Sequence, residues 1–408
     1  MRILHTSDWH LGRLFHGASL LDEQARAVAR IAELAADAEV DVVVVAGDLY
    51  DRAIPPSDAV ELFDDALLQL RRAGASVVAI AGNHDSAVRV GYGDRLLSEA
   101  GVSVRGDASR TGEAVEIPAT DGGPPLVVYP VPYLDPLRTA HLAEGDPVLE
   151  DATRGDAADG GAAVEGERRR FTHHDAMAWA MARVRADLAL RGPARSVVVA
   201  HTFLTGGNPS ESERELTMGH VEQVRLDVFD GIDYVALGHL HQGQAFDGGR
   251  VAYSGSPLPY SFSEQHHTKA VRIVDLGPDG SVEVEVVPLG VGRPLRTLTG
   301  ELEELLADPS LADAEGAWVR ARLTDRRLPL QAMARLQRRF PHAVELHHEP
   351  AGVDDTEPTR RSAAQTREAD PFELAVEFLR TQRGVEPDDE ERRLLADAFE
   401  HVRQGVSG

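Results

Sequence analysis

The chain has 408 residues, more than one hydrophobic core usually serves, so we expect two or three domains. A formal net charge of −25 argues against a general nucleic-acid coat protein, which would present a basic surface, but it does not exclude DNA as a substrate. The absence of cysteine excludes disulfides and thiolate metal sites, and no apolar run or N-terminal pattern indicates a membrane span or a signal peptide. We therefore expect a cytoplasmic protein in which histidine and carboxylate side chains hold any metal.

The first hundred residues alternate between strand and helix patterns. Apolar runs predict strands at residues 2–7, 41–46 and 76–81. Between them, apolar residues recur at helical spacing after Ser19 and after Pro55, which predicts two amphipathic helices. This βαβαβ pattern is typical of an α/β domain with right-handed crossovers. His5, inside the first strand, is interpreted as a hydrogen-bonded core histidine.

The second half of the chain carries further elements. A helix at about 173–190 and two more apolar strands, at 196–200 and 233–237, continue the α/β pattern. A hairpin signal then joins strands at 271–276 and 282–287, and strand and helix patterns alternate up to residue 347. A polar stretch precedes two short amphipathic helices, which cannot bury their apolar faces alone. We predict four parts: a first domain at 1–270, a small α+β domain at 271–348, a flexible linker at 349–369 and a partner-binding helical segment at 370–408.

Candidate metal ligands stand at or just after the ends of all five α/β strands. They are Asp8, His10, Asp48, Asn83, His201, His239 and His241. Ligands of open α/β sheets bind outside the carboxyl ends of the strands, so these side chains should converge although more than 230 residues separate them. Carboxylates, imidazoles and one amide oxygen favour Mn, Fe or Zn. A glycine precedes Asp48, Asn83 and His239, where we expect the backbone to turn tightly.

These segments resemble the signature of the calcineurin-like metallophosphoesterases: D-x-H, G-D-x-x-D, G-N-H-D, an isolated histidine and G-H-x-H. The resemblance implies an α/β sandwich fold and two divalent ions that activate water for in-line attack on phosphorus. It also implies that Asp48 bridges the ions, with Asp8, His10 and His241 at the first and Asn83, His201 and His239 at the second. By the same resemblance His84 contacts the phosphate or protonates the leaving oxygen. We expect Asp85 to orient His84.

A narrower resemblance is to the bacterial SbcD family of nuclease subunits. It rests on HTSDWHLGR at 5–13, AGDLYDRAIPPSDAV at 46–60, the loop at 209–214 and the segment at 253–264, and it is weak beyond about residue 290. The resemblance implies an Mn²⁺-dependent double-strand exonuclease and single-strand endonuclease. Such a subunit works with the SbcC ATPase on DNA ends and hairpins in repair, recombination and replication, as a homodimer within a heterotetramer.

The resemblance also points to substrate-binding residues. Some relatives outside bacteria carry histidine where Asp51 stands, three residues after the bridging aspartate, so DNA-end handling here is expected to differ. In the small domain, which the resemblance makes a DNA-contacting cap, Arg335, Arg338 and Arg339 are candidate phosphate contacts. A solvated helix face explains these arginines equally well.

Two other functions remain open from the sequence. The chain could be a stand-alone metallophosphodiesterase acting on nucleotides, although the cap and the terminal apolar helices argue against it. It could also be a non-catalytic scaffold that tethers DNA ends, although a scaffold would be expected to have lost at least one ligand. Apart from these candidates, the basic residues are nearly all arginine, with Lys269 as the only lysine, which we attribute to GC-rich codon usage.

Overall fold

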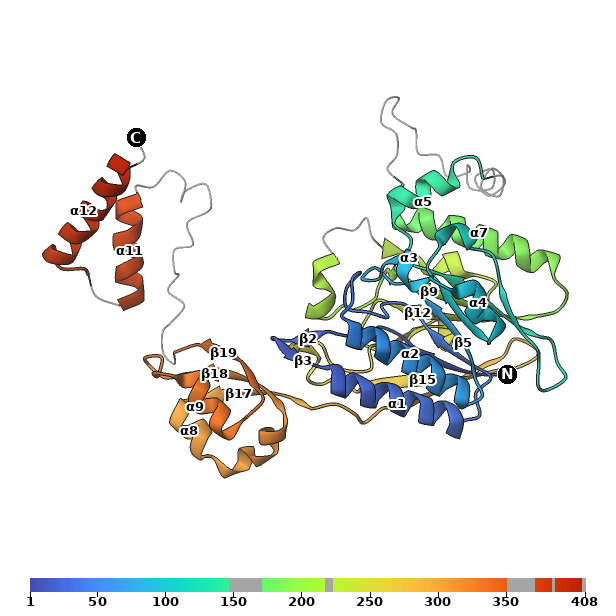
Figure 1. Ribbon diagram of the computed structural model, residues 1–408, viewed down its shortest axis with the longest axis horizontal. Coiled ribbons are helices and arrows are strands. Elements are labelled where there is room, and N and C mark those ends of the chain that lie inside the picture. Colours follow the sequence, from blue (N-terminus) through green and yellow to red (C-terminus); the bar gives the residue numbers. More distant parts are fainter. Residues whose placement is uncertain (147–170, 217–222, 351–370, 384–385, 406–408) are drawn as a thin grey trace. The chain divides into compact units, whose positions relative to one another are not determined.

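The computed structural model describes residues 1–146, 171–216, 223–350, 371–383 and 386–405 (Figure 1). The linker expected at 349–369 lies outside these ranges except for its first two residues. The chain divides into two compact units. One comprises Met1–Leu323 and Leu328–His348, and the other comprises Thr324–Arg327 and Glu349–Gly408.

The first sheet of the larger unit has six strands in the order β16-β15-β1-β4-β5-β6. Strands β1, β4, β5 and β6 are parallel, whereas β15 runs antiparallel to β1 and β16 antiparallel to β15. The bounds are β1 Arg2–Thr6, β4 Val42–Val45, β5 Ser76–Ile80, β6 Val102–Arg105, β15 Ala270–Leu276 and β16 Val282–Pro288. The four valines of β4 are all fully buried, as expected for a central strand covered on both faces.

The second sheet also has six strands, in the order β13-β14-β12-β9-β8-β7. Strands β14, β12, β9 and β8 are parallel, and the two outer strands, β13 and β7, pair antiparallel with their neighbours. The bounds are β7 Val115–Ile117, β8 Leu126–Val131, β9 Arg195–His201, β12 Tyr234–Gly238, β13 Gln244–Phe246 and β14 Val251–Tyr253.

The two sheets pack face to face, and helices cover their outer faces (Figure 1). Ile3, Val44 and Val199 belong to the apolar core between the sheets. Helices α1 (Leu21–Asp37) and α2 (Ser57–Arg72) pack on the first sheet, and α7 (His173–Leu190) packs on the second. This arrangement confirms the α/β sandwich predicted from the sequence.

Local sequence signals explain where these helices begin and end. Helix α7 begins with a capping box, in which Thr172 Oγ1 accepts the Asp175 amide proton and the Asp175 carboxylate accepts that of Thr172. Helix α2 has Asp58 in its first turn and Arg71 and Arg72 in its last, which suits the helix dipole.

The hairpin at 270–288 corrects the predicted domain boundary. We expected the second domain to begin at residue 271, but β15 pairs with β1 along Arg2–His5 and so extends the first sheet. The hairpin pattern predicted the two strands correctly. It carried no information on which sheet edge they join, because pairing between distant strands is a tertiary property.

The small domain follows this hairpin. Its three parallel strands lie in the order β17-β18-β19, with the bounds β17 Leu295–Gly300, β18 Trp318–Leu323 and β19 Ala343–His348. Helices α8 (Leu302–Ala307) and α9 (Ala332–Arg339) complete its core. An apolar cluster that includes Phe15, Phe262 and Trp318 joins it to the sandwich.

In the second unit, α11 (Pro371–Arg383) and α12 (Asp389–Gly405) pair through the rings of Phe372 and Phe399, whose centroids are 6.3 Å apart. Phe378 and Leu394 remain largely exposed. The other short elements of the chain are β2 Leu14–Phe15, β3 Ala18–Ser19, α3 Ala87–Val90, α4 Asp94–Glu99, α5 Pro136–Ala143, β10 Phe203–Leu204 and β11 Gln223–Val224.

Candidate metal centre

All seven predicted ligands lie at the carboxyl ends of parallel strands. Asp8 and His10 follow β1, Asp48 follows β4, and Asn83 follows β5. His201 is the last residue of β9, and His239 and His241 follow β12. Four of the seven adopt positive φ, an unusual conformation for residues other than glycine: Asp8 (54°), His10 (44°), Asp48 (47°) and His239 (109°). Such clustered backbone strain is typical of functional sites.

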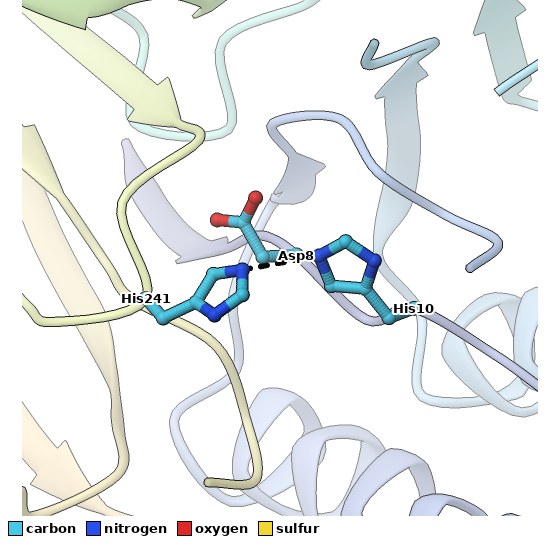
Figure 2. A group of neighbouring side chains, drawn as sticks. All are labelled: Asp8, His10 and His241. Carbon is cyan, nitrogen blue, oxygen red and sulfur yellow. Dashed lines mark hydrogen bonds between the residues drawn. The ribbon is translucent and has the colours of Figure 1, made fainter. Parts of the chain in front are cut away.

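Asp8, His10 and His241 form the first group, and Figure 2 shows Asp8 and His10 on the loop after β1 meeting His241 from the loop after β12. The Nε2 atoms of His10 and His241 are 3.1 Å apart. One ligand atom from each of the three residues lies within 4.8 Å of the others. All three side chains are buried.

Asn83, His201 and His239 form the second group. The Asn83 side-chain oxygen lies 2.9 Å from His201 Nε2 and 3.2 Å from His239 Nδ1. The other ring nitrogen of His201, Nδ1, lies 2.9 Å from the backbone oxygen of Ala46. A carbonyl can only accept, so Nδ1 carries the proton and Nε2 is left as the ligating atom.

Asp48 lies between the two groups. Its Oδ2 is 3.6 Å from His10 Nε2 and 3.4 Å from His201 Nε2. Its Oδ1 accepts the backbone N–H of His84 at 2.9 Å. A single carboxylate thus faces both ligand groups, as the resemblance implied for a bridging residue.

Three glycines leave room for this arrangement. A Cβ at Gly47 would lie 2.3 Å from His201 Nδ1, one at Gly82 would lie 2.1 Å from Asp48 Oδ1, and one at Gly238 would lie 1.8 Å from the Ala46 oxygen. Gly47 also has φ of +91°. We expected glycine at all three positions because of tight backbone turns. Positive φ explains the glycine only at Gly47, whereas Gly82 and Gly238 are required because other atoms approach their backbone closely.

The electrostatics of the cluster favour a bound cation. Burial raises the pKa of Asp8 to about 6 and lowers that of His10 well below its ordinary value. Burial would also lower the pKa of His201, but the charge and hydrogen bond of Asp48, together with the charge of Asp8 and the Ala46 oxygen, raise the pKa to about 9. Metal ions bind ionised aspartate and neutral histidine, so a divalent cation would stabilise both forms together.

The residues present therefore fit divalent metal ions. Asp8 is fully buried, and its side-chain hydrogen bonds come from the Ser7 hydroxyl and the His239 amide, both neutral donors. Among the described residues, His10 Nδ1 is buried without a hydrogen-bond partner, so His10 is oriented by its backbone and by the ring contacts around it. The oxygen and imidazole donors are those preferred by borderline divalent cations.

His84 and Asp85 adjoin the cluster but do not interact as we expected. The carboxylate of Asp85 accepts the backbone N–H groups of Leu49, Tyr50 and Gly82, each at 2.9 Å. It therefore ties the loop after β4 to the loop after β5 and does not orient the His84 ring. That ring is held instead by the backbone oxygen of Asp51, 2.9 Å from His84 Nδ1.

A cavity of about 660 Å³ opens beside the cluster, lined by Arg13, Leu14, Asp51, Asn83, His84, Glu211, Ser212 and Glu213. The prediction missed Arg13, although it lies only three residues after His10 in the motif that carried the resemblance. Its guanidinium donates to Asp51 Oδ1 at 3.2 Å and stacks 4.9 Å over the Tyr260 ring. The side chain of Asp51 therefore pairs with an arginine that lines the cavity.

The arginines predicted to contact DNA do not line this cavity. Arg335 pairs with Glu303. Arg339 donates to the backbone oxygens of Leu305 and Asp308 near the end of α8, and this structural role accounts for its position. Arg338 is exposed on the same helix.

The sequence of residues 1–243 matches the calcineurin-like phosphoesterase family. The chain belongs to the calcineurin-like phosphoesterase family. Membership in this family identifies the chain as a phosphoester hydrolase, and groups of side chains that could hold a metal ion agree with it. Residues 291–383 match a second family, SbcD_C, described as the type 5 capsule protein repressor C-terminal domain. Together the two matches confirm the resemblance to SbcD-type members of the phosphoesterase family.

Solved structures similar to this phosphoesterase include TT1561 of Thermus thermophilus, with 17% identity over 70% of this chain and 98% of that one, and a TM-score of 0.37. Another is a dimetal phosphatase from Danio rerio, with 11% identity over 71% of this chain and 96% of the other, and a TM-score of 0.36. In the described parts of the chain, every helix is too short or too polar to cross a membrane.

Proposed function

We propose that this chain is a two-metal-dependent DNA nuclease with double-strand exonuclease and single-strand endonuclease activity, in an SbcCD-like complex that processes DNA ends and hairpins. The observation that carries the proposal is the convergence of seven ligand side chains beside His84, in a chain whose residues 291–383 match the SbcD_C family. The cavity beside them is open to a large substrate and holds an arginine.

We propose that the two ligand groups hold two divalent ions, and that these ions are manganese. Asp8, His10 and His241 would hold one ion, Asn83, His201 and His239 the other, and Asp48 would be shared. When bound, such ions activate water and neutralise negative charge on the phosphoryl oxygens.

The chain's own side chains would bind the phosphate and handle the proton of the leaving group. Because His84 Nδ1 is turned to the Asp51 oxygen, Nε2 is left for the substrate, and the imidazolium form can donate a proton there. Arg13 is restrained by Asp51 and Tyr260, so its guanidinium is prepared to bind a phosphate with little further loss of side-chain entropy.

Partners are proposed from unpaired apolar surfaces. Phe378 and Leu394 are 62% and 64% exposed on the two terminal helices, the first of which lies within the residues that match SbcD_C and the second after them. We assign both side chains to an interface with an SbcC-type ATPase. Val88, Tyr92 and Leu96 are each more than 80% exposed around α3 and α4, which supports the proposed homodimer. A homodimer with two ATPase subunits would form a heterotetramer in the cytoplasm.

The activity is tested by Mn²⁺-dependent hydrolysis of linear duplex DNA, hairpin DNA and a cyclic nucleotide. The proposal predicts cleavage of both DNA substrates and little hydrolysis of the nucleotide, and the reverse order would indicate a stand-alone phosphodiesterase. His84→Ala should retain both ions and lose about 100- to 10,000-fold in rate. His141→Ala is the matched control, because His141 is an exposed histidine on α5. Wild-type cleavage in the His84 variant would exclude the proposed role.

The partner is tested by co-purification with the candidate ATPase. Removal of residues 350–408 should abolish binding to the ATPase and leave Mn²⁺ binding intact. Unchanged ATPase binding would contradict the role assigned to the terminal helices.

A further inference from the structure

The only lysine of the chain is buried next to the first ligand group. Lys269 Nζ donates to the backbone oxygen of His241 at 2.8 Å, to Ser256 Oγ at 2.9 Å and to Glu264 Oε2 at 2.5 Å. Only 8% of its side chain is exposed. A buried ammonium group is costly unless it is paired and hydrogen-bonded, so codon usage alone does not account for this lysine.

Glu264 is the partner that Lys269 keeps ionised. The side chain of Glu264 is fully buried, so it must be paired and hydrogen-bonded. The Lys269 ammonium carries only donors and bonds Oε2 directly, so the buried pair consists of an ammonium and a carboxylate. An ionised carboxylate has no proton to donate, so every hydrogen bond to Glu264 must be donated by its neighbour.

This requirement fixes the direction of the next two hydrogen bonds. Glu264 Oε1 lies 2.6 Å from Ser212 Oγ, so the single hydroxyl proton of Ser212 points to Glu264. Ser212 Oγ also lies 2.7 Å from His241 Nδ1, and with its proton already used it can only accept there. His241 therefore carries a proton on Nδ1, and the neutral ring has its lone pair on Nε2, which lies 3.1 Å from His10 Nε2.

We infer that Lys269, Glu264 and Ser212 are positioning residues that fix the tautomer and ring orientation of His241 for metal binding. The inference rests on the proposed metal centre. It assigns the chain's only lysine to the support of a metal ligand through three successive hydrogen bonds by way of Glu264 and Ser212. Arrangements of this kind tune histidine ligands in metalloproteins.

A second contact holds the same ligand from its backbone side. The Glu213 carboxylate accepts the backbone N–H of His241 and, at 2.5 Å, that of Ser210. Ser212 and Glu213 also line the cavity beside the cluster. The loop that forms one wall of the proposed substrate cavity is therefore the loop that holds His241.

The test measures Mn²⁺ binding to the full-length chain by calorimetry and by electron paramagnetic resonance of the free ion. Glu264→Gln keeps the shape of the side chain but removes the charge that dictates the proton positions, and Ser212→Ala removes the acceptor from His241. Each is expected to weaken one of two Mn²⁺ sites by about 10- to 100-fold. Glu23→Gln is the matched control, because Glu23 is buried and paired with Arg293 at 3.3 Å without contacting a ligand side chain.

A double variant keeps the test valid if Glu264→Gln alone fails to fold. Glu264→Gln combined with Lys269→Met leaves no buried charge unpaired and should show the same loss of affinity at one site. Histidine ¹⁵N spectra of the metal-free chain should show the His241 signal of the Nδ1-protonated tautomer in the wild type and a mixture of tautomers in Glu264→Gln. A purely structural role of Glu264 would lower stability without changing that signal.

The outcomes separate this inference from the proposed function. Two Mn²⁺ ions in the wild type, with one site weakened in the network variants, would support it. Two ions bound equally well by all folded variants, or an unchanged tautomer in Glu264→Gln, would overturn the network and leave the proposed function standing. A wild-type chain that binds no Mn²⁺ would overturn both.

Discussion

Gly47→Ala is expected to disrupt the metal centre without a large change in fold. The new Cβ would lie 2.3 Å from His201 Nδ1, whereas ordinary contact begins at 3.4 Å, so His201 or the Asp48 loop must move by about 1 Å. A displacement of that size at a catalytic group can reduce the rate by about 100-fold. The φ of +91° adds a backbone cost of roughly 1–2 kcal/mol for a residue with a Cβ.

Gly74→Ala separates these two effects. Gly74 has φ of +93°, almost identical to that of Gly47, but a Cβ there would meet nothing within 4 Å. Both variants should lose similar stability from the backbone, and only Gly47→Ala should also lose Mn²⁺ affinity and phosphodiester hydrolysis. The assays are chemical unfolding, Mn²⁺ titration and hydrolysis of duplex DNA. Equal Mn²⁺ affinity and activity in the two variants would refute the reasoning.

Three further predictions concern residues around the site. Arg13→Ala should lower the slope of log DNA affinity against log salt by about one, through loss of one phosphate contact, and Arg30→Ala should not; equal slopes would remove Arg13 from the substrate contacts. Asp85→Asn should lower the free energy of unfolding by about 1–3 kcal/mol in urea titrations, because the amide nitrogen cannot accept the backbone N–H groups that the carboxylate binds; wild-type stability would contradict this. Burial lowers the pKa of His5 to about 3 in the folded state, against an ordinary value of 6.5, so the unfolded chain binds the extra proton and stability falls as pH decreases from 6.5 toward 3. In His5→Gln, the free energy of unfolding should fall less steeply over this range, by about 1.4 kcal/mol per pH unit, and an unchanged slope would show that His5 is not neutral in the folded protein.

Regular patterns predicted an α/β domain and the meeting of the ligand side chains, whereas the sandwich of two sheets was predicted from the family resemblance. Parallel strands bring their carboxyl ends to one edge of a sheet, so polar residues after each strand must lie near one another. His5 was also predicted correctly as a core residue, since its ring bonds Tyr234 and the Leu237 oxygen across the sandwich. The α/β domain needed only the order and type of the strands, but the ligands after β9 and β12 belong to a second sheet, whose packing on the first was not legible from that order.

Interactions between distant segments could not be predicted from the sequence in the same way. Asp85 was assigned to His84 because the two are adjacent in sequence, but its carboxylate binds backbone N–H groups of the loops after β4 and β5, which meet only in the folded chain. Lys269 carries no motif, and Glu264 lies in a segment that supported the resemblance without indicating a role. The relation of both residues to His241 exists only after three loops have come together. The edge joined by the 270–288 hairpin was likewise set by tertiary pairing.

The central claim, a two-ion centre shared by Asp48, is tested most directly by the number of Mn²⁺ ions bound per chain in the wild type and in Asp48→Asn. The substitution preserves the size of the side chain and removes the charge that faces both His10 and His201. We predict two ions per wild-type chain and the loss of both high-affinity sites in the variant. One ion or none in the wild type, or two ions held with unchanged affinity by Asp48→Asn, would contradict it.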